Sequence, residues 1–247
     1  MTTDVTPAAL ADLVTPLLDD ALVALDVDGV LAPIVEHADQ SRLTPGVGER
    51  LERLADRSQV VIVSGRSLAD LERLFEFPAS LDVIGSHGLE MRGREELRLD
   101  DDERFLLEQL EVIGQQAVGA AGDGAWLEAK PASVVVHTRT ADPERARPAV
   151  DAVERFAAAL HGAEVKRGHE VVELLARSTS KGSAIAGLRR NGQPVVFLGD
   201  DITDESVFEI MGPGDVSVRV GPGATAAQLR LRDPDEVADF VGRLVSS

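Results

Sequence analysis

The feature that most constrains this sequence is a short apolar run that ends in two closely spaced aspartates. Residues 21–25 carry no charge, and the chain continues with Asp26, Val27, Asp28 and Gly29. Such a run is typical of a strand buried on both faces of a parallel sheet, and sheets of this kind bind ligands outside the carboxyl ends of their strands. Because Asp26 and Asp28 would point the same way along an extended chain, their repulsion must be offset by a cation, a shared proton or both. Taken alone, the stretch also fits an Asp-rich turn exposed to solvent.

The composition limits the partners and the location of the protein. The chain has 247 residues, a formal net charge of -18 and no cysteine. Strong acidity disfavours nucleic acid or an anionic membrane as a partner, and without cysteine there are no disulfides and no thiolate metal sites. Residues 1–7 lack the pattern of a signal peptide, and no apolar run approaches the ~20 residues that span a bilayer. We therefore expect a soluble, cytoplasmic protein with a substantial core.

Helices and strands alternate along most of the chain. Thr44 and Pro45 predict the start of one helix, as an N-cap followed by proline at the first helical position. The alternation indicates a doubly wound α/β core with a parallel sheet. Its predicted strands are 21–25, 60–63, 81–85, 195–198 and 216–220, and its predicted helices are 7–18, 44–54, 68–75, 183–190, 203–211 and 234–244.

The pattern changes between residues 100 and 175, where helices and strands no longer alternate one by one. One helix followed by two strands, repeated once, indicates an α+β module inserted into the first domain. We therefore expect a core domain of residues 1–99 and 176–247 and an inserted domain of residues 100–175. The predicted elements of the inserted domain are helix 100–118, strands 126–130 and 133–139, helix 143–160, and strands 163–166 and 171–175.

Polar residues follow several of the predicted core strands, and one lysine begins a helix. Hard oxygen ligands without cysteine or clustered histidine favour magnesium over zinc. A carboxylate beside the metal can attack phosphorus, and a second carboxyl two residues on can pass a proton to the leaving oxygen and later take one from water. Ser64 and Lys181 would hold the phosphoryl oxygens. The sequence thus predicts a phosphoryl-transfer site made of Asp26, Asp28, Ser64, His87, Lys181, Asp200 and Asp201.

These motifs, in their order, resemble those of the haloacid dehalogenase superfamily, and the fuller pattern resembles its trehalose-6-phosphate phosphatase branch. A lone Asp-x-Asp is a weak signal, but four ordered motifs are a strong one, and the resemblance spans residues 21–210. The superfamily motifs are Asp26–Gly29, Ser64–Arg66, Lys181–Gly182 and Gly199–Glu205. The stretches typical of the branch are Ser86–Glu90, Glu128–Ser133, His137–Arg139 and Gly199–Phe208.

The resemblance implies a role for each matching residue. It implies Asp26 as the nucleophile and a ligand of Mg²⁺, and Asp28 as the general acid/base, with the Asp28 backbone carbonyl as a second ligand of Mg²⁺. Asp200 is implied as a further metal ligand, supported by Asp201 and Asp204. The inserted domain would be a mobile cap that closes over the sugar. The residues implied in substrate binding are Arg66, His87, Gly88, Glu128, Lys130, Arg139 and Glu173.

The implied function is magnesium-dependent hydrolysis of trehalose 6-phosphate to trehalose and phosphate through an aspartyl-phosphate, with a functional link to a trehalose-phosphate synthase. One alternative is the same chemistry on a trehalose-like pseudodisaccharide phosphate or a glycosyl phosphoglycerate. An alternative of another class is a sugar-phosphate-binding module without catalysis. Measuring turnover on a panel of sugar phosphates separates these functions.

The sequence departs from the branch pattern at a few positions. Val30 stands in place of threonine and Ser86 in place of asparagine, while His169 replaces lysine and Leu175-Ala176 replaces Arg-Pro. The departures in the core affect catalysis little. Those in the inserted domain fall in the implied sugar-binding set, so they bear on the identity of the substrate.

Several implied binding residues also have an ordinary structural explanation. Glu128, Lys130 and Arg139 lie at alternating strand positions or near them, where a solvated face is common. His87 also fits a satisfied histidine at a strand end. We expect Trp126 to lie in the interior of the inserted domain rather than to stack on a sugar.

Overall fold

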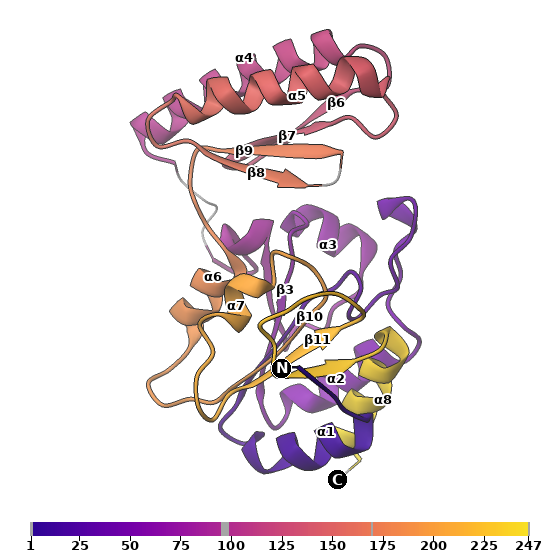
Figure 1. The fold of residues 1–247 in the computed structure, drawn as a ribbon. Coiled ribbons are helices and arrows are strands. Elements are labelled where there is room, and N and C mark those ends of the chain that lie inside the picture. The colour runs from indigo at the N-terminus through magenta and orange to yellow at the C-terminus, as the bar shows by residue number, and fades with distance from the viewer. Residues whose placement is uncertain (1, 95–98, 169, 247) are drawn as a thin grey trace. The chain divides into compact units, whose positions relative to one another are not determined.

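The structure is a computed structural model that describes residues 2–94, 99–168 and 170–246. The chain forms two compact units, one made of Met1–Arg94 and Thr179–Ser247 and the other of Glu95–Ser178. The second unit is therefore an insertion into the first (Figure 1). The division points, after Arg94 and Ser178, differ by a few residues from those expected at 99 and 175. In the part of the chain that the structure describes, no helix combines the length and apolar character needed to cross a membrane.

One sheet forms the centre of the first unit. All its neighbouring strands are parallel, except for one antiparallel pair at an edge. The predicted parallel α/β core is thus confirmed. The strand order is β1 (Thr3–Asp4), β12 (Leu229–Leu231), β11 (Val216–Val220), β10 (Val195–Gly199), β2 (Leu22–Leu25), β3 (Gln59–Val63), β4 (Asp82–Gly85) and β5 (Glu90–Met91).

Helices cover both faces of this sheet, which explains why its central strands are apolar throughout. In β2, Val23 and Leu25 pack into the cluster on one face, and Leu22 and Ala24 into the cluster on the other. The first polar residue after β2 is Asp26, at the edge of the sheet. The first face carries α1 (Pro7–Val14), α2 (Val47–Ala55), α3 (Leu68–Leu74) and α8 (Pro234–Leu244), and the second carries α6 (Lys181–Leu188) and α7 (Glu205–Phe208).

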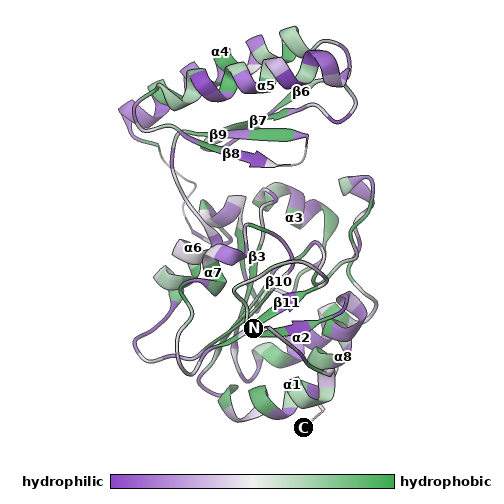
Figure 2. Ribbon diagram, viewed as in Figure 1, coloured by the Kyte–Doolittle hydropathy of each residue, from purple (hydrophilic) through white to green (hydrophobic). Residues whose placement is uncertain are grey.

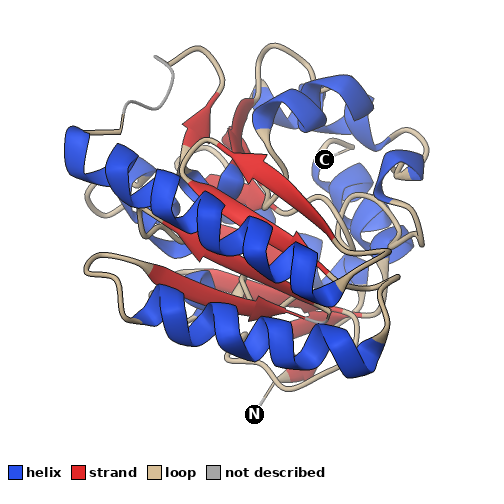
Figure 3. Ribbon diagram, turned by 90° about the horizontal axis from the view of Figure 1, so that it is seen from above, coloured by secondary structure: helices blue, strands red, loops and turns tan. Residues whose placement is uncertain are grey.

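The second unit is a four-stranded antiparallel sheet with two long helices, as expected for the α+β insert. The helices, α4 (Asp101–Ala121) and α5 (Pro143–Ala158), run side by side across the sheet (Figure 3). They pack against alternate strand residues such as Val134, Val136 and Val172. The two central strands are accordingly the most apolar (Figure 2). The strand order is β6 (Trp126–Lys130), β7 (Ser133–His137), β9 (Val171–Leu175) and β8 (Glu164–Gly168).

The predicted start of one core helix at Thr44 and Pro45 is wrong. Helix α2 begins at Val47, after a tight turn. The Val47 N–H donates to the carbonyl oxygen of Thr44 at 3.1 Å, and Gly46 has φ 77° and ψ -1°. Proline followed by glycine with positive φ is the pattern of a type II turn. Pro45 therefore shapes this turn rather than the first turn of the helix.

The predicted helix 203–211 is also wrong in its extent, because only Glu205–Phe208 is helical. Asp201 competes for the backbone groups at its start: its Oδ1 accepts from the N–H of Thr203 at 2.8 Å and from that of Asp204 at 3.2 Å. Aspartate side chains that capture nearby N–H groups favour turns over helix. This turn fixes the segment that presents the aspartates of the candidate site.

Candidate active site

Four neighbouring parallel strands end at the edge of the core sheet where the predicted polar residues lie. Strands β10, β2, β3 and β4 are adjacent and parallel, so their carboxyl ends share one edge. Asp200 follows β10, Asp26 follows β2, Ser64 follows β3 and His87 lies two residues after β4. The fold thus brings these four sequence-predicted residues to one place.

Lys181 is a buried cation among the carboxylates of this edge. It is the first residue of α6, whose N-cap Ser180 accepts from the N–H of Ser183 at 3.0 Å. The Lys181 side chain is 2% exposed, and its Nζ lies 2.9 Å from Asp26 Oδ2 and 2.8 Å from Asp204 Oδ1. Burial alone would lower the pKa of Lys181, but Asp26 and Asp204 outweigh it, so the pKa is raised and the ammonium group stays charged.

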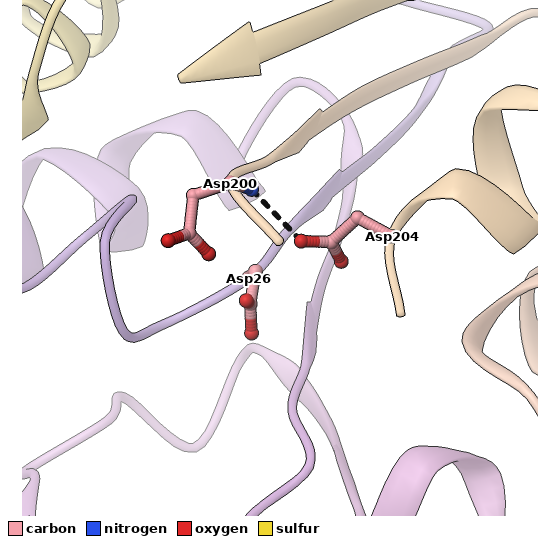
Figure 4. A group of neighbouring side chains, drawn as sticks. All are labelled: Asp26, Asp200 and Asp204. Carbon is pink, nitrogen blue, oxygen red and sulfur yellow. Dashed lines mark hydrogen bonds between the residues drawn. The ribbon is translucent and has the colours of Figure 1, made fainter. Parts of the chain in front are cut away.

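Three aspartates lie around the same point. Each of Asp26, Asp200 and Asp204 offers a carboxylate oxygen within 4.8 Å of those of the others (Figure 4). Burial raises the pKa of Asp26 well above its ordinary value, although Lys181 opposes the shift. Burial, with repulsion from Asp201 and Asp204, raises the pKa of Asp200 to about 7. These shifts mean that the cluster holds more negative charge than Lys181 alone offsets.

Asp204 is held by the backbone of the loop as well as by Lys181. Its Oδ2 accepts from the N–H group of Asp200 at 2.8 Å (Figure 4) and from that of Asp201 at 3.1 Å. Burial raises the pKa of Asp204 despite the opposing Lys181. For Asp201, burial acts in the same direction, but Lys181 and the hydrogen bonds from Thr203 prevail and lower its pKa. Both aspartates thus shape the loop that presents Asp200, which suits the supporting role implied for them.

The turn after Asp26 brings the backbone against Asp200. Gly29 has φ 77°, a conformation that residues with a side chain rarely adopt. A Cβ atom at this position would overlap the Asp200 carboxylate. Val30, the residue that departs from the family pattern, is fully buried in the apolar core, where valine fits without an unpaired hydroxyl. The tight approach at Gly29 therefore couples the β2 and β10 strand ends.

The Asp28 side chain is bound to Arg66. Its two oxygens accept from Arg66 Nε at 2.5 Å and Nη2 at 2.7 Å, and from Ser41 Oγ at 3.1 Å. The carboxylate of Asp28 does not belong to the three-aspartate group formed by the described residues. Its metal role, implied for the backbone carbonyl, stays a prediction. Ser41, which the motifs did not single out, supports Asp28 from the loop after β2.

The turns after β3 and β4 are packed on each other. Ser64 is 2% exposed, its carbonyl oxygen accepts from the His87 N–H at 3.0 Å, and its Oγ accepts from the Arg66 N–H at 3.2 Å. A Cβ atom on Gly65 would lie 2.5 Å from His87 Cε1, so only glycine lets the imidazole pack here. His87 is thus a contact of the Ser64-Gly65-Arg66 turn.

Three residues in a row after β4 have positive φ: Ser86 at 48°, His87 at 54° and Gly88 at 112°. Such a conformation is strained for residues with side chains and persists only where the surroundings fix it. Here the Glu90 carboxylate accepts from Ser86 Oγ at 2.5 Å and from the Leu68 N–H of α3 at 3.1 Å. Glu90 therefore fixes this turn, a role that sequence reasoning missed although Glu90 belongs to a quoted motif.

The inserted unit pairs its candidate binding residues across the strands. Glu128 Oε2 lies 2.8 Å from His137 Nε2, Lys130 Nζ lies 3.3 Å from Glu173 Oε1, and the same oxygen accepts from Ser133 Oγ at 2.6 Å. These side chains belong to the sheet face that points away from α4 and α5, because the intervening residues pack on the helices.

Other predicted residues of the inserted unit lie elsewhere. Arg139 follows the end of β7, is 66% exposed and lies 3.7 Å from Glu170 Oε2. Leu175 and Ala176 are both buried, but only Ala176 packs in the cluster under the helices, while Leu175 lies on the opposite sheet face in register with Ser133. His169 lies outside the described residues. The expectation that Trp126 lies in the interior is wrong, because Trp126 is 52% exposed.

Comparison with known proteins identifies the family. A model of the trehalose-phosphatase family matches residues 24–235. The chain belongs to the trehalose-phosphatase family. The resemblance inferred from the motifs is thus confirmed.

Named members of this family align with most of the chain. It is 35% identical over 250 residues to the trehalose-phosphate phosphatase of Mycobacterium tuberculosis (strain ATCC 25618 / H37Rv), which covers 92% of this chain and 63% of that protein. It is 35% identical over 234 residues to the trehalose-6-phosphate phosphatase of Escherichia coli (strain K12), covering 90% of this chain and 85% of that protein. The chain thus spans less than two thirds of the mycobacterial relative's length.

A solved structure of the family shares the fold. The C-terminal domain of Candida albicans trehalose-6-phosphate phosphatase has a TM-score of 0.81 and 23% sequence identity, with 100% of this chain and 98% of that chain covered. The likeness therefore extends over the core and the inserted unit of this trehalose-phosphatase family member.

Proposed function

We propose that this chain hydrolyses trehalose 6-phosphate to trehalose and inorganic phosphate. The observation that carries the proposal is the buried Lys181, which contacts both Asp26 and Asp204 at the carboxyl edge of a parallel sheet. A charge cluster of this kind is costly to bury and serves no evident structural need. The substrate is supported by family membership and by the names of the mycobacterial and E. coli relatives.

In this proposal Asp26 is the nucleophile. One of its carboxylate oxygens attacks phosphorus, the bond between phosphorus and the sugar oxygen breaks, and an aspartyl-phosphate forms. Asp28 gives a proton to the departing sugar oxygen and later takes one from the water that releases phosphate. Lys181 and Ser64 hold phosphoryl oxygens. Arg66 would turn from Asp28 to the phosphoryl group, which frees the Asp28 carboxyl for proton transfer.

The residues of the site fit a magnesium ion. The described cluster offers buried carboxylate oxygens and no sulfur or imidazole, the donor set that Mg²⁺ prefers. Asp26 and Asp200 are the best placed side chains to hold it, with the Asp28 backbone carbonyl, because both Asp204 oxygens already accept hydrogen bonds. When bound, Mg²⁺ would neutralise charge on the phosphoryl oxygens.

The inserted unit supplies the sugar contacts in this proposal and acts as the cap. Glu128, Lys130 and Glu173 offer charged groups that suit the hydroxyls of a disaccharide, with Arg139 at the end of β7 as a further contact. His87 and Gly88 would meet the sugar from the core. A protein that consumes trehalose 6-phosphate depends on a synthase that makes it, and this link and a cytoplasmic location are part of the proposal.

The main rival is a module that binds a sugar phosphate without cleaving it. Binding alone needs no nucleophile beside a buried lysine, and here Asp26, Asp28, Lys181 and Asp200 are all present. The same chemistry on a pseudodisaccharide phosphate or a glycosyl phosphoglycerate is the second rival. The alternative substrates differ from trehalose 6-phosphate in the group that carries the phosphate, so comparing turnover decides among them.

The test measures inorganic phosphate released from trehalose 6-phosphate and from an aryl phosphate, with Mg²⁺ and with EDTA. We expect metal-dependent release by the wild type and a loss of more than about 1,000-fold in Asp26→Asn. Asp19→Asn, the same change at a side chain that is 86% exposed, is the matched control and stays active. Release from the aryl phosphate alone would refute the substrate, and no release from either would favour the binding module.

A further inference from the structure

On strands β6, β7 and β9, the sheet face opposite to α4 and α5 has an ordered arrangement of side chains. Strand register places its residues in three rows, and successive rows on one face of a strand lie roughly 7 Å apart. The first row holds two aromatic rings and a valine, and the second carries two carboxylates and a valine. The rows are Trp126, His137 and Val171; Glu128, Val135 and Glu173; and Lys130, Ser133 and Leu175.

Trp126 and His137 form a stacked pair within the first row. Their ring centroids lie 3.8 Å apart and their planes differ by 5°. The imidazole is itself fixed, since His137 Nε2 lies 2.8 Å from Glu128 Oε2. One face of the indole is therefore covered by a ring held in place, while Trp126 as a whole remains 52% exposed. A half-exposed indole contributes less to the stability of the fold than a buried one. Its position therefore suggests a role other than packing.

We propose that Trp126 is a platform on which a pyranose ring of the sugar phosphate stacks. This inference rests on the proposed function and deepens it. A pyranose presents C–H groups on one face, which are apolar and slightly positive, and the indole face is apolar and slightly negative. The neighbouring Glu128 and Lys130 lie on the same strand face and can bond the hydroxyls at the ring edge. His137 is a positioning residue, because it sets the plane of the indole.

The first test uses the fluorescence of the indole. Trp126 is the only tryptophan of the sequence, so its emission reports this position alone. The Asp26→Asn variant, which we expect to bind without turnover, is titrated with trehalose 6-phosphate, with trehalose and with inorganic phosphate. Binding is followed in parallel by calorimetry. We expect both sugars to move the emission to shorter wavelength, because a sugar ring displaces water from the indole, and inorganic phosphate to leave it unchanged.

The second test compares the kinetics of substituted proteins that carry Asp26. We expect Trp126→Ala to raise KM for trehalose 6-phosphate roughly tenfold, with kcat/KM for a small aryl phosphate within about twofold of wild type. Trp126→Phe retains a ring and should recover most of the affinity. Phe156→Ala is the matched control, since Phe156 is 63% exposed on α5, on the other side of the sheet. It should change neither KM for trehalose 6-phosphate nor kcat/KM for the aryl phosphate.

The outcomes separate the platform from the proposed function. One outcome is that trehalose 6-phosphate binds with measurable heat but does not change the emission, and that Trp126→Ala leaves KM unchanged. This outcome overturns the platform and leaves the proposed function standing. A second outcome is that this sugar phosphate gives no heat of binding and no turnover, while an aryl phosphate is still hydrolysed. This outcome overturns both the proposed substrate and the platform. The expected outcome is that Trp126→Ala raises KM, that Trp126→Phe keeps KM near the wild-type value, and that the sugars shift the emission. This outcome supports the platform and the proposed function.

Discussion

The core and the inserted unit hold their polar residues in different ways. At the core edge, Asp204 is fixed by two backbone N–H groups and by Lys181, in surroundings that exclude water. On the sheet face of the inserted unit opposite to α4 and α5, Glu128 and Glu173 contact side chains that reach across from neighbouring strands. A group fixed by the backbone has little freedom to adapt, whereas a cross-strand pair can exchange its partner for a ligand hydroxyl.

This difference fits a division of labour. Phosphoryl transfer needs charges that are already in place when the reaction begins, because preorganised groups need not rearrange as charge develops. Sugar recognition needs many hydrogen bonds of similar strength, and partly exposed pairs supply them at low cost. The contrast predicts that changes in the core affect stability and every substrate, and that changes in the inserted unit affect only the substrates that carry a sugar.

The largest expected effect comes from Lys181→Met. The substitution leaves Asp26 and Asp204 buried without their cation, and breaking a buried ion pair from one side costs about 3–5 kcal/mol. At pH 8 without metal, we expect the Tm to fall by roughly 10 °C, measured by thermal denaturation. With Mg²⁺ added, we expect phosphate release to be lost. Lys166→Met is the matched control: its Nζ lies 3.8 Å from Glu164 on the inserted sheet, and a partly exposed pair contributes at most about 1 kcal/mol. A Tm that moves equally little in both variants would contradict the contrast.

Sequence reasoning predicted which core residues lie at one edge of the sheet, because their spacing is tied to the fold. Asp26, Ser64 and Asp200 each follow an apolar run, and adjacent parallel strands bring such positions together whatever the loops do. What the sequence could not supply was the hydrogen bonding around them. The turns at Gly46 and Asp201 depend on competition between helix and side-chain bonds, and two- or three-residue strands such as β1 and β12 have no periodic pattern to detect.

The inserted unit was less predictable at the level of single residues. Alternation predicted its strands, but it does not say which of the two faces the helices cover. That ambiguity misplaced Trp126, which alternates with Leu127, and the helix-facing side proved to be that of Leu127. Likewise, the link between Ser86 and Glu90 needs a run of positive φ that no sequence pattern of this kind announces.

An intermediate effect is expected from Asp200→Asn in the absence of metal. The pKa of Asp200 is raised to about 7 in the folded protein, above the ordinary 3.8. Between these values the folded state binds a proton that the unfolded state has released, so stability falls as pH rises through this window and stays lower above pH 7. The shift corresponds to at most about 4 kcal/mol, and solvent near the carboxylate reduces it to the order of 2 kcal/mol.

We therefore expect Asp200→Asn to be more stable than wild type at pH 8 in EDTA, with a Tm several degrees higher, and to lose this advantage near pH 4. Adding Mg²⁺ should raise the Tm of wild type and not that of the variant, since a ligand stabilises the state that binds it. Thermal denaturation at pH 4, 6 and 8 measures both effects, with Asp19→Asn as the exposed control. A variant that is less stable than metal-free wild type at pH 8 would show that the Asp200 carboxylate is satisfied without a cation.

The smallest effect is expected from Glu173→Gln in the inserted unit. Glutamine keeps an oxygen for Ser133 Oγ but loses the ion pair with Lys130. Because the two side chains are only 12% and 13% exposed, the free energy of unfolding should fall by about 1–2 kcal/mol. A charged hydrogen-bond acceptor for a sugar hydroxyl is also lost, which should raise KM for trehalose 6-phosphate about tenfold with kcat little changed. Glu164→Gln, the same change on β8, should leave KM as it is.

The decisive comparison for Glu173→Gln is the aryl phosphate, which has no sugar to bind. If kcat/KM for that substrate stays within about twofold of wild type while the sugar phosphate loses tenfold, Glu173 acts in recognition alone. If both substrates lose activity equally, Glu173 also contributes to the chemical step, and the division of labour between the two units fails. Because both substrates are tested on the same folded variant, their comparison separates the sugar contact from any loss of stability. Lys181→Met in the core cannot make this separation, since it should abolish the hydrolysis of both substrates.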